Sequence, residues 1–451
     1  MSFKEFKPYP KYKDSGVEWM GKVPEHWEIK RLKHIADIRL SNVDKHTVEG
    51  QKVVRLCNYL DVYNNRRITS KVDFMTATAS DEQITRLSVR KDDVIITKDS
   101  EDPSDIGIPA LVAEDIFGLV CGYHLAILRP TASNGEFLHY FLQSIFVRSA
   151  FEVEATGMTR YALGKYSIEN LIFVTPPLTE QQSIATFLDQ ETSRIDTLIS
   201  EKERLSSLLQ EYRQALISHA VTKGLDPNVK MEDSGVEWLG EIPKHWEVLK
   251  LKYLATICGG GTPSKLKQEF WEGDLPWVSP KDLKSNTIDD TEDHITKEAV
   301  LESSTQIIPS QTVLIVVRSG ILQHTIPIAI NTVPVALNQD MKAILFNEMI
   351  NPLYFLYLVT GLESLLLLEW RKKGPTVESI ESEYLLNTFI PVPPIFEQNS
   401  IAATLLEKTS RIDTLIFEAK KFIELLKEYR SSLISAAVTG KINVFDKSGS
   451  L

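Results

Sequence analysis

The chain has 451 residues and a formal net charge of −11, and this length corresponds to two or three domains. Its composition is 43% hydrophobic and 25% charged, which is typical of globular proteins. No apolar run approaches the roughly 18 residues of a membrane span, and the N-terminus lacks the apolar core of a signal peptide. The acidic balance excludes a surface covered in basic groups for nucleic acid.

The cysteines and the distribution of charge along the chain limit the class of protein further. Cys57, Cys121 and Cys258 are scattered without a CxxC pair, which predicts free thiols in a reducing compartment, so we expect a cytoplasmic protein. Residues 1–175 carry 23 basic and 24 acidic side chains, whereas residues 225–390 carry 14 and 23. Any contact with nucleic acid is therefore expected to be a local patch on an acidic scaffold.

The opening segment of the chain occurs twice. Residues 14–21, Asp-Ser-Gly-Val-Glu-Trp-Met-Gly, return as residues 233–240 with one substitution, and a Pro-x-His-Trp-Glu motif at residues 24–28 returns at 243–247. We expect the repeated tryptophans to anchor each opening segment to a domain core. A period this long predicts duplicated domains and excludes a solenoid of short repeats.

Each opening segment precedes a body of mixed secondary structure. Short β-branched runs bounded by turn residues predict strands at residues 93–97, 125–128, 312–317 and 342–346. Residues 136–146 and 352–370 read as helices. A glycine run at residues 259–261 predicts a turn that leaves a strand. It is no phosphate loop, because Gly-Lys-Ser/Thr does not follow at the required spacing.

Two long stretches without Pro or Gly, residues 178–223 and 395–439, follow the bodies. Thr179 and Gln182 are expected to form a capping box at the first. A spacing of alternate fours and threes predicts an apolar seam on each helix, formed by Ile184, Leu188, Glu191, Ile195, Leu198, Lys202, Leu205, Leu209, Tyr212, Leu216 and His219, and by Ile401, Leu405, Lys408, Ile412, Leu415, Ala419, Phe422, Leu426, Tyr429, Leu433 and Ala436. About 40 residues at about 1.5 Å each make a rod near 60 Å, which favours a mutual coil, although two amphipathic helices on separate domains fit the same pattern.

The motifs and their order resemble the specificity subunit of type I restriction-modification systems over essentially the whole chain. The Pro-x-His-Trp openings, the Pro-Pro-Leu-x-Glu-Gln and Pro-Pro-Ile-x-Glu-Gln helix starts, and their duplication carry the resemblance. It implies an α+β fold: two mixed α/β target-recognition domains separated by two long helices that form an antiparallel coiled coil, with internal pseudo-two-fold symmetry. If the seams pair in full register, Lys202 would lie near Ala419.

The expected domain organisation follows from the duplication. It comprises a first target-recognition domain, a central long helix, a second target-recognition domain, a C-terminal long helix and a tail, at residues 1–175, 176–224, 225–390, 391–440 and 441–451. The resemblance implies that each domain reads one half of a split DNA sequence. It also implies two methyltransferase subunits as partners, with restriction and translocase subunits attached through them.

The sequence carries no recognisable catalytic machinery. Adenine methylation needs a cofactor loop and an Asn/Asp-Pro-Pro-aromatic motif, and residues 175–178 and 392–395 lack both the leading polar residue and the trailing aromatic. We therefore expect a non-enzymatic chain that binds no cofactor and no metal itself, with S-adenosylmethionine, ATP and Mg²⁺ in partner subunits. A self-contained methyltransferase or nuclease with unrecognised motifs, and a coiled-coil adaptor that binds only protein, are the alternatives.

Reading of DNA requires Arg, Lys, Asn or Gln side chains at base edges and cations at phosphates. Such residues gather in loop-like stretches of both bodies, where a solvated surface loop is the competing interpretation for each. The candidates for DNA contact are Asn64, Asn65, Arg66, Arg67, Thr159, Arg160, Tyr161, Gln323, His324, Asn338, Gln339, Arg371, Lys372 and Lys373.

Overall fold

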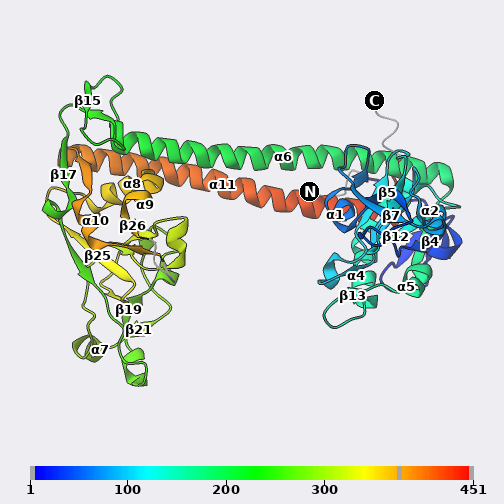
Figure 1. Ribbon diagram of the computed structural model, residues 1–451, viewed down its shortest axis with the longest axis horizontal. Coiled ribbons are helices and arrows are strands. Elements are labelled where there is room, and N and C mark those ends of the chain that lie inside the picture. The colour runs from blue at the N-terminus through cyan, green and yellow to red at the C-terminus, as the bar shows by residue number, and fades with distance from the viewer. Residues whose placement is uncertain (1–5, 373–377, 446–451) are drawn as a thin grey trace. The chain divides into compact units, whose positions relative to one another are not determined.

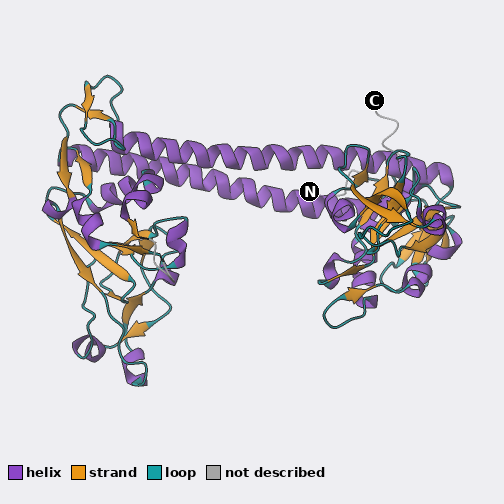
Figure 2. Cartoon of the chain, in the orientation of Figure 1, coloured by secondary structure: helices purple, strands orange, loops and turns teal. Residues whose placement is uncertain are grey.

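The computed structural model describes residues 6–372 and 378–445 (Figure 1). The chain forms two compact units, residues 1–203 with 421–451 and residues 204–420. Each unit contains one body of mixed helices and strands together with part of both long helices (Figure 2). The predicted α+β class with an internal duplication is confirmed.

The long helices are α6 (Leu178–Lys223) and α11 (Ile395–Val438). In the first unit Asp196 on α6 pairs with Arg430 on α11, and Lys202 lies over the ring of Phe422. The later residue of α6 therefore contacts the earlier residue of α11. The helices are thus antiparallel, as predicted (Figure 1). In the second unit Arg213 of α6 pairs with Asp413 of α11 in the same sense.

The predicted register between the helices is wrong. With Lys202 opposite Ala419, residue 196 would lie opposite residue 425, but the ion pair places it opposite residue 430. Lys202 Nζ is 5.6 Å from the centre of the Phe422 ring, where its cation meets the aromatic face. These two contacts thus place the pairing three to five residues away from the register that the seam pattern suggested.

Part of each predicted seam is also corrected. Positions such as Ile195 and Ile412 are buried as expected, but Leu198, Leu205 and Tyr212 are exposed on α6, as are Leu415 and Phe422 on α11. The buried positions one residue further along are Thr192, Ser206, Thr409, Ile416 and Ile423. The two buried α6 positions in this set, Thr192 and Ser206, are polar, whereas the seam pattern selected Glu191 and Leu205 next to them.

Both bodies contain a five-stranded and a three-stranded sheet with the same strand order. In the first unit the orders are β4-β12-β8-β10-β6 and β11-β5-β7, and in the second β18-β25-β22-β23-β20 and β24-β19-β21. The first set comprises β4 (Ala36–Leu40), β5 (Lys52–Cys57), β6 (Arg67–Ile68), β7 (Met75–Ala79), β8 (Val94–Thr97), β10 (Pro109–Val112), β11 (Leu119–Cys121) and β12 (Leu125–Pro130). The second comprises β18 (Ala255–Gly259), β19 (Leu275–Val278), β20 (Thr287–Ile288), β21 (His294–Ile295), β22 (Val313–Val316), β23 (Ile328–Asn331), β24 (Ala336–Leu337) and β25 (Met341–Phe346).

The four strands predicted from β-branched runs are β8, β12, β22 and β25. All four residues of β8 and of β22 are buried, which explains why their sequences show continuous apolar character instead of alternation. The glycine run begins where β18 ends, as predicted. A Cβ on Gly260 would lie 2.2 Å from the carbonyl oxygens of Leu337 and Asn338, so the close approach of the two segments requires glycine.

Each body packs two short helices where one was predicted. α3 (Gly135–Gln143) and α4 (Ile145–Glu154) are separated by Ser144, whose side chain accepts from the Val147 amide and caps α4. α8 (Pro352–Gly361) and α9 (Glu363–Trp370) meet at a bend of 88°. Among the described residues no single helix is long and apolar enough to cross a membrane, although this bent pair passes by length and composition together.

The two repeated motifs contact each other within each unit. Glu180, in the first turn of α6, accepts from His26 at 2.8 Å and from the indole nitrogen of Trp27 at 3.1 Å. His245 and Glu397 repeat the first contact at 2.8 Å in the second unit. Trp27 is fully buried, so the predicted anchoring role of the tryptophan is confirmed. The histidine and glutamate tie the opening segment to the helix start.

A glutamine beside this glutamate fastens the helix start to the body. Gln181 accepts from the Asn134 amide and donates to the Pro176 carbonyl, both at 2.8 Å. The predicted capping box is wrong, because Thr179 is already the second residue of α6. Gln182 instead accepts from the Asn134 side chain at 2.8 Å. Gln182 thus contacts a segment distant in sequence and does not cap the helix.

Candidate nucleic-acid interface

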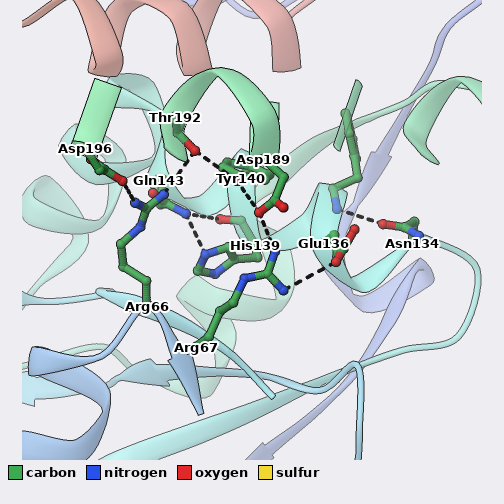
Figure 3. A network of polar contacts seen from close by, with 11 residues as sticks. Arg66, Arg67, Asn134, Glu136, His139, Tyr140, Gln143, Asp189, Thr192 and Asp196 are labelled. Carbon is green, nitrogen blue, oxygen red and sulfur yellow. Dashed lines mark hydrogen bonds and ion pairs between the residues drawn. The ribbon is translucent and has the colours of Figure 1, made fainter. Parts of the chain in front are cut away.

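Two residues predicted to contact DNA, Arg66 and Arg67, point toward α6 (Figure 3). They follow α1 (Tyr59–Asn64), and Arg67 begins β6. Arg66 pairs with Asp196. Arg67 donates to Asp189 at 2.5 Å and to Glu136 at 3.4 Å. Both guanidinium groups therefore hold the first body against the helix, a contact that we call the first junction.

Polar side chains of α3 complete the first junction (Figure 3). The Tyr140 hydroxyl lies 3.2 Å from the Thr192 hydroxyl, and Gln143 Nε2 lies 2.7 Å from His139 Nε2. Burial, with the neighbouring guanidinium groups, lowers the pKa of His139 to about 3. The imidazole is therefore neutral over the physiological range and adds no positive charge to this crowded cationic site.

The asparagines next to these arginines have different environments. Asn64 is the last residue of α1 and is exposed. Asn65 is half-buried and donates from its side chain to the Asp61 carbonyl at 2.9 Å, which closes the last turn of α1. Asn64 is thus accessible to a ligand, whereas the amide nitrogen of Asn65 is already used within the domain.

A second charged cluster lies beyond β8, where β9 (Asp99–Ser100) pairs with β13 (Tyr161–Ala162). The buried Asp99 carboxylate is 2.5 Å from His124 Nδ1 and 4.0 Å from Arg160 Nε. Thr159 and Arg160 are exposed, and Tyr161 is half-buried. The pairing of β9 with β13 therefore brings the predicted residues 159–161 next to a histidine and a carboxylate from other loops.

The same region contains aromatic and cationic groups around a hollow of about 510 Å³. His46, Tyr59, Tyr123 and His124 are among its lining residues. Lys98 lies 4.5 Å from the centre of the Tyr123 ring. Exposed aromatic side chains stack on bases, and cationic side chains contact phosphates.

The second body has a charged cluster at the corresponding place. Arg318 Nε lies 2.5 Å from Asp340 Oδ1, and the Gln339 side chain donates to the other oxygen of Asp340 at 3.3 Å. Asn338 is buried, and its side-chain oxygen accepts from the Asp340 amide at 2.9 Å. Gln339 is exposed, so of the two predicted residues it is the one with an accessible side chain.

The remaining candidates of the second body lie around the end of α9. Arg371 donates to the backbone carbonyl of Gln323 at 3.5 Å. The side chains of Gln323 and His324 are exposed. Lys372, in β26 (Arg371–Lys372), is exposed and lies 3.3 Å from Glu381. Lys373 lies outside the described residues. The fold thus brings together side chains that are about 50 residues apart in sequence.

The two clusters carry opposite charges at equivalent positions. Asp99 stands two residues after β8 and bridges to Ala162, and Arg318 stands two residues after β22 and bridges to Ser379. The first position is an acid that faces a histidine, and the second is a cation that faces an acid. The duplicated fold therefore presents different hydrogen-bonding groups from the same structural position.

Sequence reasoning missed these residues. The missed set is Lys98, Asp99, His124, Arg318 and Asp340. A signal was present, because Lys98, Asp99 and Arg318 lie within two residues of the end of a buried strand, and His124 and Asp340 directly precede β12 and β25. Polar residues directly after apolar strands are common at chain turns, and only the pairing of the loops in space distinguishes them.

These features define a class: a duplicated binding protein with two similar bodies, paired long helices and a different charged cluster in each body. Residues 24–207 and 243–424 match the family model of the type I restriction modification DNA specificity domain. The chain therefore belongs to this family.

Relatives with sequence similarity carry related names. The chain is 38% identical over 266 residues to the "Type I restriction enzyme EcoR124I/EcoR124II specificity subunit" of Escherichia coli, covering 57% of this chain and 60% of that one. It is 34% identical over 193 residues to the "Type I restriction enzyme MjaIX specificity subunit" of Methanocaldococcus jannaschii, covering 42% and 43%. The matches with these two relatives thus span about half of their lengths. A match to the "Putative type I restriction enzyme MjaX specificity subunit" of the same archaeon is 25% identical and covers 94% and 96%.

Solved structures share the fold. The crystal structure of the HsdS subunit from Thermoanaerobacter tengcongensis superimposes with a TM-score of 0.55 at 18% identity, covering 93% of this chain and 98% of that one. A chain from a study of complex assembly and conformational transition of the type I R-M system gives a TM-score of 0.70 at 17% identity, covering 92% and 98%. At these identities the likeness extends to the fold alone.

Proposed function

We propose that this chain is the sequence-specific DNA-binding subunit of a type I restriction-modification complex. Its two bodies read the two halves of a bipartite target, and it has no catalytic role of its own. The observation that carries the proposal is the opposite charge at one structural position, Asp99 in one body and Arg318 in the other. Two copies of one scaffold with different hydrogen-bonding groups are suited to two different half-sequences.

The partners follow from the same proposal. Two methyltransferase subunits bind the chain, one for each half of the duplication, and restriction and translocase subunits join through them. S-adenosylmethionine, ATP and Mg²⁺ act in those partners, and the complex works in the cytoplasm. Family membership and the twofold repeat of the helix contacts support this arrangement.

The candidate residues divide into two groups by their contacts. Exposed side chains near the charged clusters are proposed to contact DNA directly, and these are Asn64, Thr159, Arg160, Gln323, His324, Gln339 and Lys372, with Lys373 as the next residue in the sequence. Arg371 is half-buried beside Lys372 and is also proposed to contact DNA. Asn65, Tyr161 and Asn338 are half-buried or buried and are proposed to shape the loops that carry them. Arg66 and Arg67 keep a proposed phosphate contact only if DNA competes with their carboxylate partners.

The alternative is a self-contained methyltransferase or nuclease. Such an enzyme would need a cofactor loop or a set of catalytic carboxylates. In the described residues each charged cluster consists of an acid paired with a base in the loops of one body. No observation favours this alternative over the specificity subunit.

Mapping of methylated adenines tests the proposal. DNA from a host that expresses the complete system should carry methyl groups at one split sequence, and deletion of this chain should remove them all. Exchange of residues 225–390 for the same segment of a relative should change one half-sequence and leave the other unchanged. A change in both halves, or methylation that survives deletion, would contradict the proposal.

A further inference from the structure

The second unit keeps only part of the first junction. In both units a tyrosine hydroxyl on the body faces a threonine hydroxyl on a long helix, Tyr140 with Thr192 and Tyr357 with Thr409, at 3.2 and 3.3 Å. The helix ion pair beside them is also kept, as Asp196–Arg430 and as Asp413–Arg213. These four groups, namely the tyrosine, the threonine and the two residues of the ion pair, therefore recur in both units.

The strand that supplies the arginines is present in both units but differs in sequence. The Leu111 amide donates to the Arg66 carbonyl at 2.9 Å, and the Ile330 amide donates to the Asn286 carbonyl at the same distance. Asn286 therefore stands where Arg66 stands, and Thr287 stands in the position of Arg67. The two long side chains that fill the first junction are absent from the second.

A hollow of about 600 Å³ lies at this place in the second unit. Asn286, Thr287, Tyr357, Thr409 and Asp413 are among its lining residues. Three leucines replace the other polar groups of the first junction, namely Leu353 for Glu136, Leu356 for His139 and Leu406 for Asp189. The acceptors of Arg67 are thus replaced by apolar groups, whereas the acceptors of Arg66 remain.

Of the two kept acceptors, Asp413 is accessible, whereas Thr409 is buried. Arg66 bonds Asp196 and Thr192 in the first junction, and the equivalent Asp413 side chain is 52% exposed. Asp196 holds two guanidinium groups, while Arg213 bonds Asp413 at 2.8 and 3.3 Å. A carboxylate with a hydroxyl beside it and leucines around it suits a guanidinium on an aliphatic stem.

We propose that this hollow binds an arginine side chain of a partner polypeptide, in the place that Arg66 occupies in the first junction. Resting on the proposed function, the partner is a methyltransferase subunit. The rim supports a protein partner, because Leu406 and Phe417 on α11 are 53% and 67% exposed. The equivalent α6 positions are Asp189 and Ser200. Exposed apolar groups around a pocket are typical of protein interfaces.

The two docking positions are therefore not equivalent. The first junction is filled by the chain's own Arg66, and the second is open. A methyltransferase arginine enters only the second, so one of the two copies gains a contact that the other lacks. Twofold duplication thus produces one stronger and one weaker docking position.

The substitution Asn286→Arg tests the proposal by filling the hollow from within the chain. The introduced side chain starts from the position of Arg66 and can reach Asp413. We expect binding of one methyltransferase copy to weaken at least about tenfold, the scale of an interface hot spot, with the other copy unaffected. Asn286→Gln is the matched control with added length but no charge. The measurement is calorimetric titration of the full chain with the methyltransferase subunit of the same system.

Thermal unfolding separates failure of this proposal from failure of the proposed function. Asn286→Arg should raise the unfolding temperature relative to Asn286→Gln, and Asp413→Asn in the same chain should remove the gain. Two copies bound equally well by wild type and Asn286→Arg would overturn the arginine site and leave the proposed function intact. If wild type binds no methyltransferase, the proposed function fails and with it this partner. A wild-type dimer that Asn286→Arg dissociates would assign the hollow to a second copy of the chain and also overturn it.

Discussion

Asp196 on α6 accepts from Arg430 on α11 at 2.9 Å, and the same pair occurs 217 residues away with the helices exchanged. In the second unit Arg213 donates to Asp413 at 2.8 Å. The duplication thus includes the contact between the helices as well as their sequences. It does not include the surroundings, because Asp196 has a further partner in Arg66.

This difference predicts unequal effects of removing the two carboxylates. Asp196→Ala leaves two guanidinium groups without their acceptor, and the Arg430 side chain is only 17% exposed. We expect a loss of about 2–3 kcal/mol, compared with about 1 kcal/mol for Asp413→Ala. Calorimetric unfolding of both variants gives the comparison. Equal losses would show that Arg66 contributes nothing at this site.

Arg160 provides a prediction for DNA recognition. Its side chain is half-exposed, and its contact with Asp99 is long at 4.0 Å, so the guanidinium can turn to a base or a phosphate. Arg160→Ala should weaken binding of the assembled complex by about 1–3 kcal/mol, with the second half-sequence read as before.

Arg194 is a matched control for this prediction. It is exposed on α6 and pairs with Glu191 within one helical turn, far along the chain from the charged cluster. Arg194→Ala should leave DNA affinity unchanged in the same filter-binding or fluorescence measurement. Equal weakening by both substitutions would indicate a general charge effect, and Arg160 would lose its assigned role.

Under the proposed function, α6 and α11 determine the distance between the two half-sequences. A seven-residue insertion keeps the period of the seam, so one heptad after Glu203 and one after Lys420 should preserve helix pairing. Each adds about 10 Å of helix, equal to about three base pairs of DNA. We expect methylation at the same two half-sequences with a longer gap. New half-sequences at the old gap would contradict this ruler role.

The duplication, the long helices and the main strands could be predicted because repetition and apolar runs are local signals. The seam was wrong at several positions because a helix contact can use a small or hydrogen-bonded residue in place of a leucine. Thr192 and Thr409 are buried since each meets a tyrosine hydroxyl of the adjacent body. A partner of that kind lies about 50 residues away and leaves no periodic trace in the sequence.

The candidate site shows the same limit. Arg66 and Arg67 have the residue types that contact DNA, yet both face carboxylates on α6. Asp99 and His124 were missed because neither follows a motif, and only the fold places them 2.5 Å apart. Residue type predicts what a side chain is able to bind. The position of its charged neighbours, which no local pattern encodes, decides whether it is available.

His139 predicts a dependence of stability on pH that only the first unit has, since Leu356 takes its place in the second. Burial lowers its pKa to about 3 in the folded state, against an ordinary value of about 6.5. Below about pH 6.5 the unfolded chain binds a proton that the folded chain does not, so the free energy of unfolding falls as the pH drops toward 3. The full contribution is present above that range.

His139→Leu should therefore lose less stability than wild type between pH 7.5 and 5.5, by about 1 kcal/mol. His34→Leu, at an exposed position, is the control and should behave as wild type. Parallel pH profiles for wild type and His139→Leu would mean that the imidazole is not neutral in the folded protein.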